Sequence, residues 1–347
     1  MTNSPQNKVL VLALSGIGNF IMQMPFFKVL KQAHPEWHIT VAVTPRGTNE
    51  LAQHCTSIDE VIELNLKQNF AEHIQSIKVV RQQHFSISFM LSPGQLIKGS
   101  LFLALSGIPE RIAHRYPFVG LQHSSFLLTK SILENPDLHD IEQNLNLLSL
   151  IDINLPSESY YELPIPMVHE KVANDMLAQL NLTAEKNLIG FHVGSAPHFE
   201  WKRWPVENFI ALGKELIAKK DAHLVLFGGP EEQALKENVR QALAPHATII
   251  NHSSLLTTAG IIRKCSLFIS NDSGLMHLAA AVGIETFGLF GPTDENQTGP
   301  RGVKSHAIRA AGTNPVYNTE KNIDLGTASH STLKQLKPAD ILSQLNV

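Results

Sequence analysis

The segment SNDSGLMHLAAAVG, residues 270–283, combines an acid, a hydroxyl, a glycine and a histidine between two apolar runs. Asp272 or Ser273 can cap the start of a helix, and Gly274 leaves room there for a ligand. His277 lies one helical turn further along. These groups can bind polar parts of a ligand. The ordinary alternatives are helix capping by Asp272 and a hydrogen-bonded core position for His277.

A second loop, GSAPHFEWKRWP at residues 194–205, carries groups that suit an anion. Lys202 offers a mobile positive charge, and the helix that Pro205 should open offers free backbone N–H groups. Ser195 adds a hydroxyl. The loop has two tryptophans around its lysine, which a merely solvated basic loop rarely needs. We therefore favour an anion-binding loop over a solvated one.

Two further loops place glycines at the ends of apolar runs. In FGGPEE, residues 227–232, either Glu231 or Glu232 could hold the hydroxyls of a ribose. Alternatively, both acids only favour the positive end of a helix. GPTDENQTGP, residues 291–300, is a glycine- and proline-rich loop of the same kind. Loops of this kind on one edge of a sheet outline a site of nucleotide size.

Near the N-terminus, the motif SGIGN places Gly16, Gly18 and Asn19 between an expected strand and an expected helix. Glycines here allow a backbone to approach a ligand closely. Ile21 stands where a dinucleotide-binding fingerprint has its third glycine, and no GK[ST] follows as in a P-loop. A plain tight turn is an equally good interpretation of this motif.

Short apolar runs alternate with helical patterns along the whole chain, which predicts parallel sheets flanked by helices. The expected strands are residues 8–14, 38–43, 61–64, 84–91, 187–193, 222–229, 247–252, 265–269 and 285–290. The expected helices are residues 20–33, 205–219, 231–243, 255–264, 275–282 and 336–345. Residues 155–170, rich in proline and polar side chains, are the expected linker. The pattern predicts two doubly wound α/β domains, with ligand loops at the carboxyl ends of the strands.

Composition narrows the class of protein. The length of 347 residues and the hydrophobic content of 43% favour two globular domains, and the net charge of −3 argues against a general nucleic-acid binder. Cys55 and Cys265 are expected to be small buried residues in a reducing compartment. No apolar window reaches membrane-spanning length. Neither HExxH nor CxxC nor GxSxG is present, so we expect no metal, no cofactor and no serine hydrolase.

In combination, these motifs resemble glycosyltransferase family 9, the heptosyltransferase-like enzymes of lipopolysaccharide core assembly. SNDSGLMHLAAAVG with GLFGPTDENQTGP, GFHVGSAPHFEWKRWP, LFGGPEE and LALSGIGNFIMQMPFFKVLK carry the likeness, which runs nearly end to end. It implies a GT-B fold, two Rossmann-like domains facing across a cleft. Residues 1–165 would bind the acceptor, residues 166–330 the nucleotide-sugar donor, and residues 331–347 would form a C-terminal helix. It also implies inverting, metal-independent transfer, commonly from ADP-heptose.

The resemblance assigns roles residue by residue. The donor residues that it implies are Ser195, Lys202, Glu231, Glu232, Asp272, Ser273, Gly274 and His277. Lys202 would hold the donor phosphates, either Glu231 or Glu232 the nucleoside, and Asp272 the sugar hydroxyls. The leaving diphosphate would then be neutralised by one ammonium group, backbone N–H groups and helix dipoles.

One position departs from the family. Its characterised members have an aspartate after the second glycine, which takes the proton of the acceptor, whereas this chain has Asn19. An amide is not a general base. Another group, such as His114 or an acid, would then serve as base, or Asn19 would orient a different acceptor. In the third interpretation, the protein binds a nucleotide sugar without transferring it.

The leading hypothesis is a cytoplasmic glycosyltransferase acting on a glycan or glycolipid acceptor at the inner membrane. The alternatives are a non-catalytic nucleotide-sugar-binding protein and a GT-B sugar-nucleotide epimerase. Residues 111–130, which mix basic and aromatic side chains, suggest a peripheral membrane contact, with an ordinary surface helix and loop as the alternative.

Overall fold

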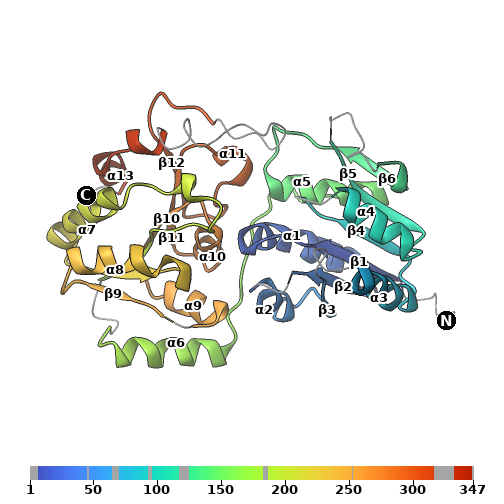
Figure 1. The fold of residues 1–347 in the computed structure, drawn as a ribbon, viewed down its shortest axis with the longest axis horizontal. Helices are drawn as coiled ribbons and strands as arrows, with labels where there is room; N and C mark the ends of the chain where they lie inside the picture. Colours follow the sequence, from blue (N-terminus) through green and yellow to red (C-terminus); the bar gives the residue numbers. More distant parts are fainter. Residues whose placement is uncertain are drawn as a thin grey trace. The chain divides into compact units, whose positions relative to one another are not determined.

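The computed structural model describes residues 7–44, 47–64, 70–92, 96–116, 125–182, 187–251, 253–315 and 332–345. The chain divides into two compact units, Met1–Tyr160 and Tyr161–Val347. Each unit has a parallel sheet of six strands flanked by helices (Figure 1). The predicted fold class, two doubly wound α/β domains, is confirmed. The assignment of acceptor and donor to the two units stays a prediction.

The first sheet has the order β3-β2-β1-β4-β5-β6, so its strand order reverses beside β1. Its strands are β1 (Lys8–Ala13), β2 (His38–Val43), β3 (Glu60–Glu63), β4 (Ile87–Met90), β5 (Glu110–Arg115) and β6 (Lys130–Leu133). Its helices are α1 (Ile17–Ala33), α2 (Thr48–Gln53), α3 (Phe70–Gln82), α4 (Leu96–Leu105), α5 (Asp140–Asn146) and the short η1 (Ser125–Leu127) and η2 (Leu147–Ile151). The loops after β1 and β4 therefore lie where doubly wound sheets bind ligands.

β1 and α1 together present the N-terminal glycine motif. All residues of β1 after Lys8 are buried, as expected for a central parallel strand covered on both faces. α1 begins at Ile17, directly after Gly16, three residues earlier than predicted. Gly18 and Asn19 therefore lie in the first helical turn and not in a loop.

The second sheet has the order β12-β11-β10-β7-β8-β9, with the reversal beside β7. Its strands are β7 (Asn187–His192), β8 (Ala222–Phe227), β9 (Ala247–Ile249), β10 (Leu267–Asn271), β11 (Glu285–Phe290) and β12 (Ser305–Arg309). Its helices are α6 (Met167–Gln179), α7 (Val206–Lys220), α8 (Gln233–Ala242), α9 (Leu255–Ile262), α10 (Gly274–Ala281), α11 (Glu295–Thr298) and α13 (Pro338–Gln344), with η3 (Glu200–Lys202) and η4 (Pro230–Glu232).

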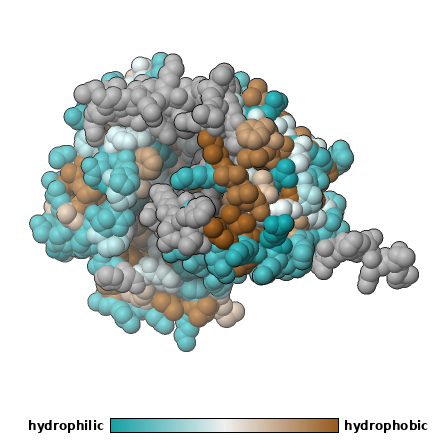
Figure 2. Space-filling model, turned by 45° about the vertical axis from the view of Figure 1, so that its right-hand side comes forward, coloured by the Kyte–Doolittle hydropathy of each residue, from teal (hydrophilic) through white to brown (hydrophobic). Residues whose placement is uncertain are grey.

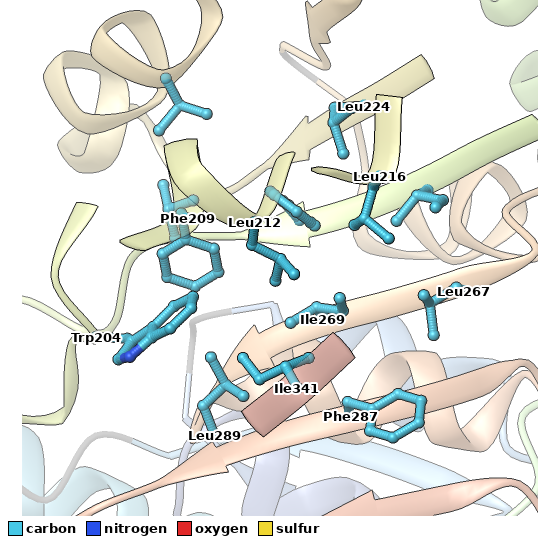
Figure 3. Packing of buried hydrophobic residues seen from close by; sticks show 14 of the residues in the cluster. Trp204, Phe209, Leu212, Leu216, Leu224, Leu267, Ile269, Phe287, Leu289 and Ile341 are labelled. Atoms are coloured by element: carbon cyan, nitrogen blue, oxygen red, sulfur yellow. The ribbon is translucent and has the colours of Figure 1, made fainter. Parts of the chain in front are cut away.

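Trp204 joins the loop after β7 to the core of the second unit. Its buried indole packs edge-on against Phe209, with ring centroids 4.9 Å apart (Figure 3). Its Nε1 donates to the carbonyl oxygen of Leu336 at 2.9 Å. Ile341, on α13, belongs to the same core (Figure 3). Replacing a tryptophan packed in this way by alanine costs about 3–5 kcal/mol of stability.

Several predicted boundaries are corrected by the structure. The strand expected at residues 265–269 is β10, which continues through Asn271. The expected linker, residues 155–170, belongs largely to the second unit, because Tyr161 and Leu163 are buried and α6 begins at Met167. Leu163 and Ile165, which alternate with prolines, are buried, whereas a free linker would be solvated.

Residues 111–130 are also organised differently from the surface helix and loop that we considered. Their first part is β5, whose residues Ile112, Ala113 and His114 are buried. The basic ends of this strand masked its apolar centre in the sequence. Residues 117–124 lie outside the described residues. Among the helices that the structure describes, none has both the length and the apolar character needed to cross a membrane.

Candidate functional site

The polar side chains that the sequence singled out in the second unit follow β7, β8, β10 and β11. In a parallel sheet these strand ends share one edge, beside the reversal of strand order. The structure brings Lys202, Asp272 and His277 within electrostatic reach of one another there. The amide of Asn271, fully buried at the end of β10, supports this arrangement.

Asn271 fastens the loop after β7 to β10. Its Oδ1 accepts from the backbone N–H of Trp204 at 2.9 Å. Its Nδ2 donates to the carbonyl oxygens of Val193 and Gly194 at 3.0 and 3.1 Å. One side chain therefore holds both ends of the loop, and this fixes the backbone that carries Lys202. Sequence reasoning missed Asn271 because it treated this position as part of a turn.

Lys202 and Asp272 form an ion pair at the centre of the site. Nζ of Lys202 lies 2.6 Å from Oδ2 of Asp272, and the hydroxyl of Thr293 donates to the same oxygen at 2.7 Å. The rings of Phe199 and Trp201 each have their centroid 5.4 Å from Nζ. The Lys202 side chain keeps 19% of its surface exposed, so its charge remains available to a ligand.

Electrostatics keep Asp272 ionised. Burial alone would raise the pKa of this carboxyl, but the charge and hydrogen bond of Lys202, together with the hydroxyl of Thr293, outweigh burial and lower it. The site therefore holds one buried carboxylate and one partly exposed ammonium group. A ligand phosphate entering here would compete with Asp272 for Lys202.

His277 is a buried, neutral histidine. Burial lowers its pKa to about 4, against the opposing charge of Asp272. The backbone N–H of Arg301 donates to the Tyr161 hydroxyl at 2.7 Å, and this hydroxyl lies 3.1 Å from Nδ1 of His277. This hydroxyl and Nδ1 therefore share one hydrogen bond, whose direction follows the tautomer of the neutral ring. This is the hydrogen-bonded core position that we weighed as the alternative, placed within reach of the charged pair.

The two glutamates after β8 differ in how far their side chains are exposed to solvent. Glu231 is exposed, whereas Glu232 is 3% exposed and fills the space beside two glycines. A Cβ added at Gly194 or Gly228 would come within 1.8 or 2.2 Å of the Glu232 carboxylate oxygens. These glycines therefore make room for a protein side chain, where the sequence suggested room for a ligand. Glu231 likewise lies over a glycine, because a Cβ added at Gly229 would come within 2.3 Å of its carboxylate, but its side chain is exposed. The predicted contact of either glutamate with a nucleoside stays a prediction.

The Glu232 carboxylate is bound to His192, the last residue of β7. Nε2 of His192 lies 3.2 Å from both carboxylate oxygens, and Nδ1 lies 2.8 Å from the hydroxyl of Ser273. The N–H of Gly229 donates to the same carboxylate at 2.8 Å. Sequence reasoning missed His192 inside the apolar run NLIGFHV. Its position as the one ionisable residue of that run, at the carboxyl end, was an available signal.

Ser195 has a buried hydroxyl that is engaged within its own loop. It donates to the carbonyl oxygen of Phe199 at 2.8 Å and accepts from Nε of Arg203 at 3.0 Å. Arg203 also donates to the carbonyl oxygen of Ser195 at 3.1 Å. In this structure Ser195 shapes the loop, and its predicted contact with a donor stays a prediction. Gly274 is the first residue of α10, directly after Ser273.

In the first unit, Gly16, Gly18 and Asn19 lie at the start of α1. Gly16 is exposed, and a Cβ added to it would meet no atom within 4 Å. Asn19 is half-buried. His114, considered as a base, is 2% exposed on β5, and burial lowers its pKa to about 4. Such burial leaves little room for contact with an acceptor.

A polar cluster lies beneath this turn. Nε2 of Gln23 donates to the carbonyl oxygen of Ser92 at 3.0 Å, and the N–H of Ser92 donates to Oδ1 of Asn144 at 2.8 Å. These bonds tie α1 and α5 to the end of β4. In the part of the chain that the structure describes, no cluster of three or more histidine, cysteine, aspartate or glutamate side chains is arranged for a metal ion.

The two cysteines are buried and unpaired, as predicted. Burial raises the pKa of the Cys265 thiol to about 12 and raises that of Cys55 as well. Both are therefore packing residues.

Comparison with known proteins identifies the family of this chain. The model of glycosyltransferase family 9 (heptosyltransferase) matches residues 74–325. Lipooligosaccharide heptosyltransferase 2 of Haemophilus ducreyi is 27% identical, with 98% of each chain covered. Lipopolysaccharide heptosyltransferase 2 of Escherichia coli K12 is 25% identical, covering 98% of this chain and 97% of that protein.

Solved structures share the fold. The ADP-heptose lipopolysaccharide heptosyltransferase II of E. coli has a TM-score of 0.77 at 23% identity, covering 98% of this chain and 97% of that one. The family 9 glycosyltransferase of Veillonella parvula has a TM-score of 0.83 at 23% identity, with 98% and 96% covered. Because the family model matches well over half of its length, this chain belongs to glycosyltransferase family 9, the heptosyltransferases.

Proposed function

We propose that this protein is an inverting, metal-independent glycosyltransferase that moves a heptose from ADP-heptose to a lipopolysaccharide acceptor. The observation that carries the proposal is the Lys202–Asp272 pair at the carboxyl edge of the second sheet. The relatives named heptosyltransferase 2 align over nearly their whole length, which supports the same class of donor and acceptor here.

The chemistry that this site offers is stabilisation of a leaving diphosphate. Cleavage of the sugar–phosphate bond develops negative charge on the phosphate and an oxocarbenium-like sugar. Lys202 supplies a positive charge, and the backbone N–H groups at the start of α10 supply donors. Asp272 then exchanges its partner: released from Lys202 by the phosphate, its carboxylate accepts from sugar hydroxyls.

On the acceptor side, we assign Asn19 to orienting the acceptor hydroxyl. Its amide can donate and accept hydrogen bonds but cannot take a proton at neutral pH. The near-complete burial of His114 argues against that residue as base. The attacking hydroxyl would then lose its proton late, to solvent or to a group of the acceptor itself.

We also propose that the protein works in the cytoplasm, at the inner face of the membrane that holds a glycolipid acceptor. Helix α4 exposes Ile97, Leu101 and Leu105 at a spacing of four residues, with exposed fractions of 38%, 46% and 52%. Phe126, on η1 beside α4, is 81% exposed. Figure 2 shows a continuous band of hydrophobic residues on the face in view, bordered by hydrophilic ones. Such a face suits shallow insertion among lipid headgroups.

Transfer is tested by incubating the protein with ADP-heptose and lipopolysaccharide core acceptors, and measuring heptosylated product and released ADP by mass spectrometry. We expect product in the wild type and in Lys214→Ala, a control at an exposed position of α7. Lys202→Met should lose at least about 100-fold of the transfer rate. Donor turnover that needs no divalent cation and continues in a chelator would support metal independence. Absence of both transfer and donor hydrolysis would contradict the proposal.

Asn19 favours one second candidate, a protein that binds a nucleotide sugar without transferring it. Its mark would be affinity for ADP-heptose without turnover, with transfer appearing only in Asn19→Asp. An epimerase, by contrast, would convert the donor with no acceptor present. The same mass-spectrometric assay, run with and without acceptor, separates all three.

A further inference from the structure

A chain of three side chains crosses the second unit from η4 through β7 to the start of α10. Glu232, His192 and Ser273 are joined by contacts of 3.2 and 2.8 Å, with the histidine in the middle. The side chains of Glu232 and His192 keep only 4% and 6% of their surfaces exposed, whereas Ser273 is half-exposed. A buried pair of a carboxylate and an imidazole therefore ends at a hydroxyl that a ligand can reach, next to Asp272.

The carboxylate end of this chain is fixed as an anion. Burial would raise the pKa of Glu232, but the hydrogen bond and charge of His192, the N–H of Gly229 and the charge of Arg203 together lower it. Lys236, whose ammonium group donates to the carbonyl oxygen of Gly228 at 3.0 Å, adds a further positive charge nearby. Glu232 therefore accepts hydrogen bonds only, so His192 carries a proton on Nε2.

The other ring nitrogen then decides how Ser273 behaves. In the neutral ring, Nδ1 accepts a hydrogen bond from the Ser273 hydroxyl. Only the lone pairs of the Ser273 oxygen then face outward. In the doubly protonated ring, Nδ1 donates to the Ser273 oxygen, and the hydroxyl proton is free to point outward. Ser270, whose hydroxyl lies 3.1 Å from that of Ser273, donates its own proton to the carbonyl oxygen of Asn271 at 2.7 Å and so can only accept from Ser273.

We propose that Glu232, His192 and Ser273 form a proton-linked relay: binding of a nucleoside diphosphate adds a solvent proton to His192, and Ser273 then donates its hydroxyl proton to a phosphate oxygen. Ionised phosphate oxygens accept hydrogen bonds and cannot donate them, so the ligand favours the second arrangement. His192 and Glu232 are positioning residues that act through Ser273. The proposal rests on the proposed function only for the diphosphate nature of the ligand.

Linkage fixes the sign of the effect. Because binding takes up a proton, ADP binds more tightly at lower pH, and its affinity falls by at most about tenfold for each unit of rising pH. His277 does not titrate in this range, because burial lowers its pKa to about 4. His198, exposed on the loop after β7, is the histidine that could mimic the effect and therefore needs its own control.

The experiment is a calorimetric titration of the full-length protein with ADP between pH 7.0 and 8.5, in buffers of different ionisation enthalpy. The dependence of the observed heat on the buffer counts the protons taken up. The wild type should take up as much as one proton per ADP, and so should His198→Gln. His192→Gln, which keeps an amide for hydrogen bonding but cannot titrate, should take up none and lose the pH dependence.

Two further pairs of variants separate the relay from general packing. Ser273→Thr keeps the hydroxyl and should keep proton uptake, whereas Ser273→Ala should lose it and bind ADP several-fold more weakly. Glu232→Gln has the same shape but cannot stabilise a charged ring, so its uptake should fall. Equal proton uptake in wild type and His192→Gln, or loss of uptake in His198→Gln, would overturn the relay.

The tautomer of His192 is a test that needs no ligand. In protein labelled with ¹⁵N-histidine, the signal that His192→Gln removes should carry its proton on Nε2 at high pH. A proton on Nδ1 would overturn the relay directly. Failure of the proposed function has a different signature: proton-linked ADP binding as expected, with no transfer from ADP-heptose. If neither ADP nor inorganic pyrophosphate binds at all, both proposals are wrong.

Discussion

Nζ of Lys202 lies 2.6 Å from Oδ2 of Asp272, so the cation proposed to hold the donor phosphates already has an anionic partner in the ligand-free protein. The pair is asymmetric, because the aspartate side chain is 7% exposed and the lysine side chain 19%. The lysine can move toward a ligand while the aspartate stays fixed by Thr293.

Lys202→Met should separate stability from activity. Removing the lysine leaves Asp272 buried and unpaired, which costs about 3–5 kcal/mol, so the melting temperature should fall. The double variant Lys202→Met/Asp272→Asn removes both charges and should recover much of that stability while staying inactive. Thermal unfolding and the transfer assay measure the two effects. Recovery of transfer in the double variant would contradict the role of Lys202.

Two of the buried histidines, His114 and His277, predict sensitivity to acid. His114 and His277 have pKa values lowered to about 4 by burial, whereas histidines in an unfolded chain titrate near about 6.5. The unfolded state therefore binds more protons as the pH falls from 6.5 toward 4, and the folded state loses about 3 kcal/mol per histidine across that window.

Melting temperatures at pH 7 and pH 5 check this prediction. His114→Gln should reduce the acid sensitivity of the first unit, and His277→Gln that of the second. The exposed His198→Gln is the control and should behave as the wild type. If His114→Gln and His277→Gln lose as much stability between pH 7 and pH 5 as the wild type, these two histidines are not the cause of the acid sensitivity.

Asn19→Asp should raise the rate of transfer. An aspartate at this position, in the first turn of α1, supplies the base that the amide lacks, and general base catalysis contributes about 10²–10⁴-fold. Because Asn19 is half-buried and the change keeps the shape of the side chain, folding should stay intact. The comparison is kcat with ADP-heptose for the wild type, Asn19→Asp and Asn19→Ala. If Asn19→Asp and Asn19→Ala are equally slow, the position does not face the acceptor.

Gly194→Ala should destabilise the second unit through Glu232. The added methyl group would fall 1.8 Å from Oε1 of that residue, a distance that no relaxation of a buried side chain easily absorbs. In a background of Glu232→Ala the same methyl group has space, so the cost should largely vanish. A double-mutant cycle of melting temperatures tests this coupling. Gly16→Ala is the control, because its Cβ meets open space. Additive effects of the two changes would refute the contact.

Asn271→Leu should loosen the loop after β7 without touching its charged residues. The change leaves the N–H of Trp204 and the carbonyl oxygens of Val193 and Gly194 without the partner that they now have. Unsatisfied buried groups cost about 1–3 kcal/mol each. Hydrogen exchange should become faster in residues 194–204, and ADP should bind more weakly. Unchanged exchange in that loop would contradict the role of Asn271.

The sequence was sufficient to predict the two α/β units and the loops that carry Lys202 and Asp272. Strand-end polar residues are visible as breaks between apolar runs, and their meeting on one edge follows from parallel topology. The sequence was not sufficient to predict contacts between residues that are far apart in the chain. The pairing of His192 with Glu232 and of Tyr161 with His277 depends on how segments 40 and 116 residues apart in the chain come together in the fold.

Local ambiguity accounts for the remaining differences. Both glutamates of GGPEE suit a helix start, and only packing against Gly194 and Gly228 distinguishes the buried Glu232 from the exposed Glu231. β5 begins with Glu110 and Arg111 and ends with Arg115, and β6 begins with Lys130, so charged residues hide how short these strands' apolar parts are. The start of α1 lacks a side-chain cap, so the sequence held no mark for its true first residue.

The indole of Trp204, bonded to the carbonyl oxygen of Leu336, connects the C-terminal segment to the loop that carries Lys202, the residue proposed to hold the donor phosphates. Trimming the protein after residue 331 would strip the buried Leu336 and Ile341 from around that indole. Such a truncation should therefore lower the affinity for the proposed sugar donor, although every residue proposed to contact that donor would still be present.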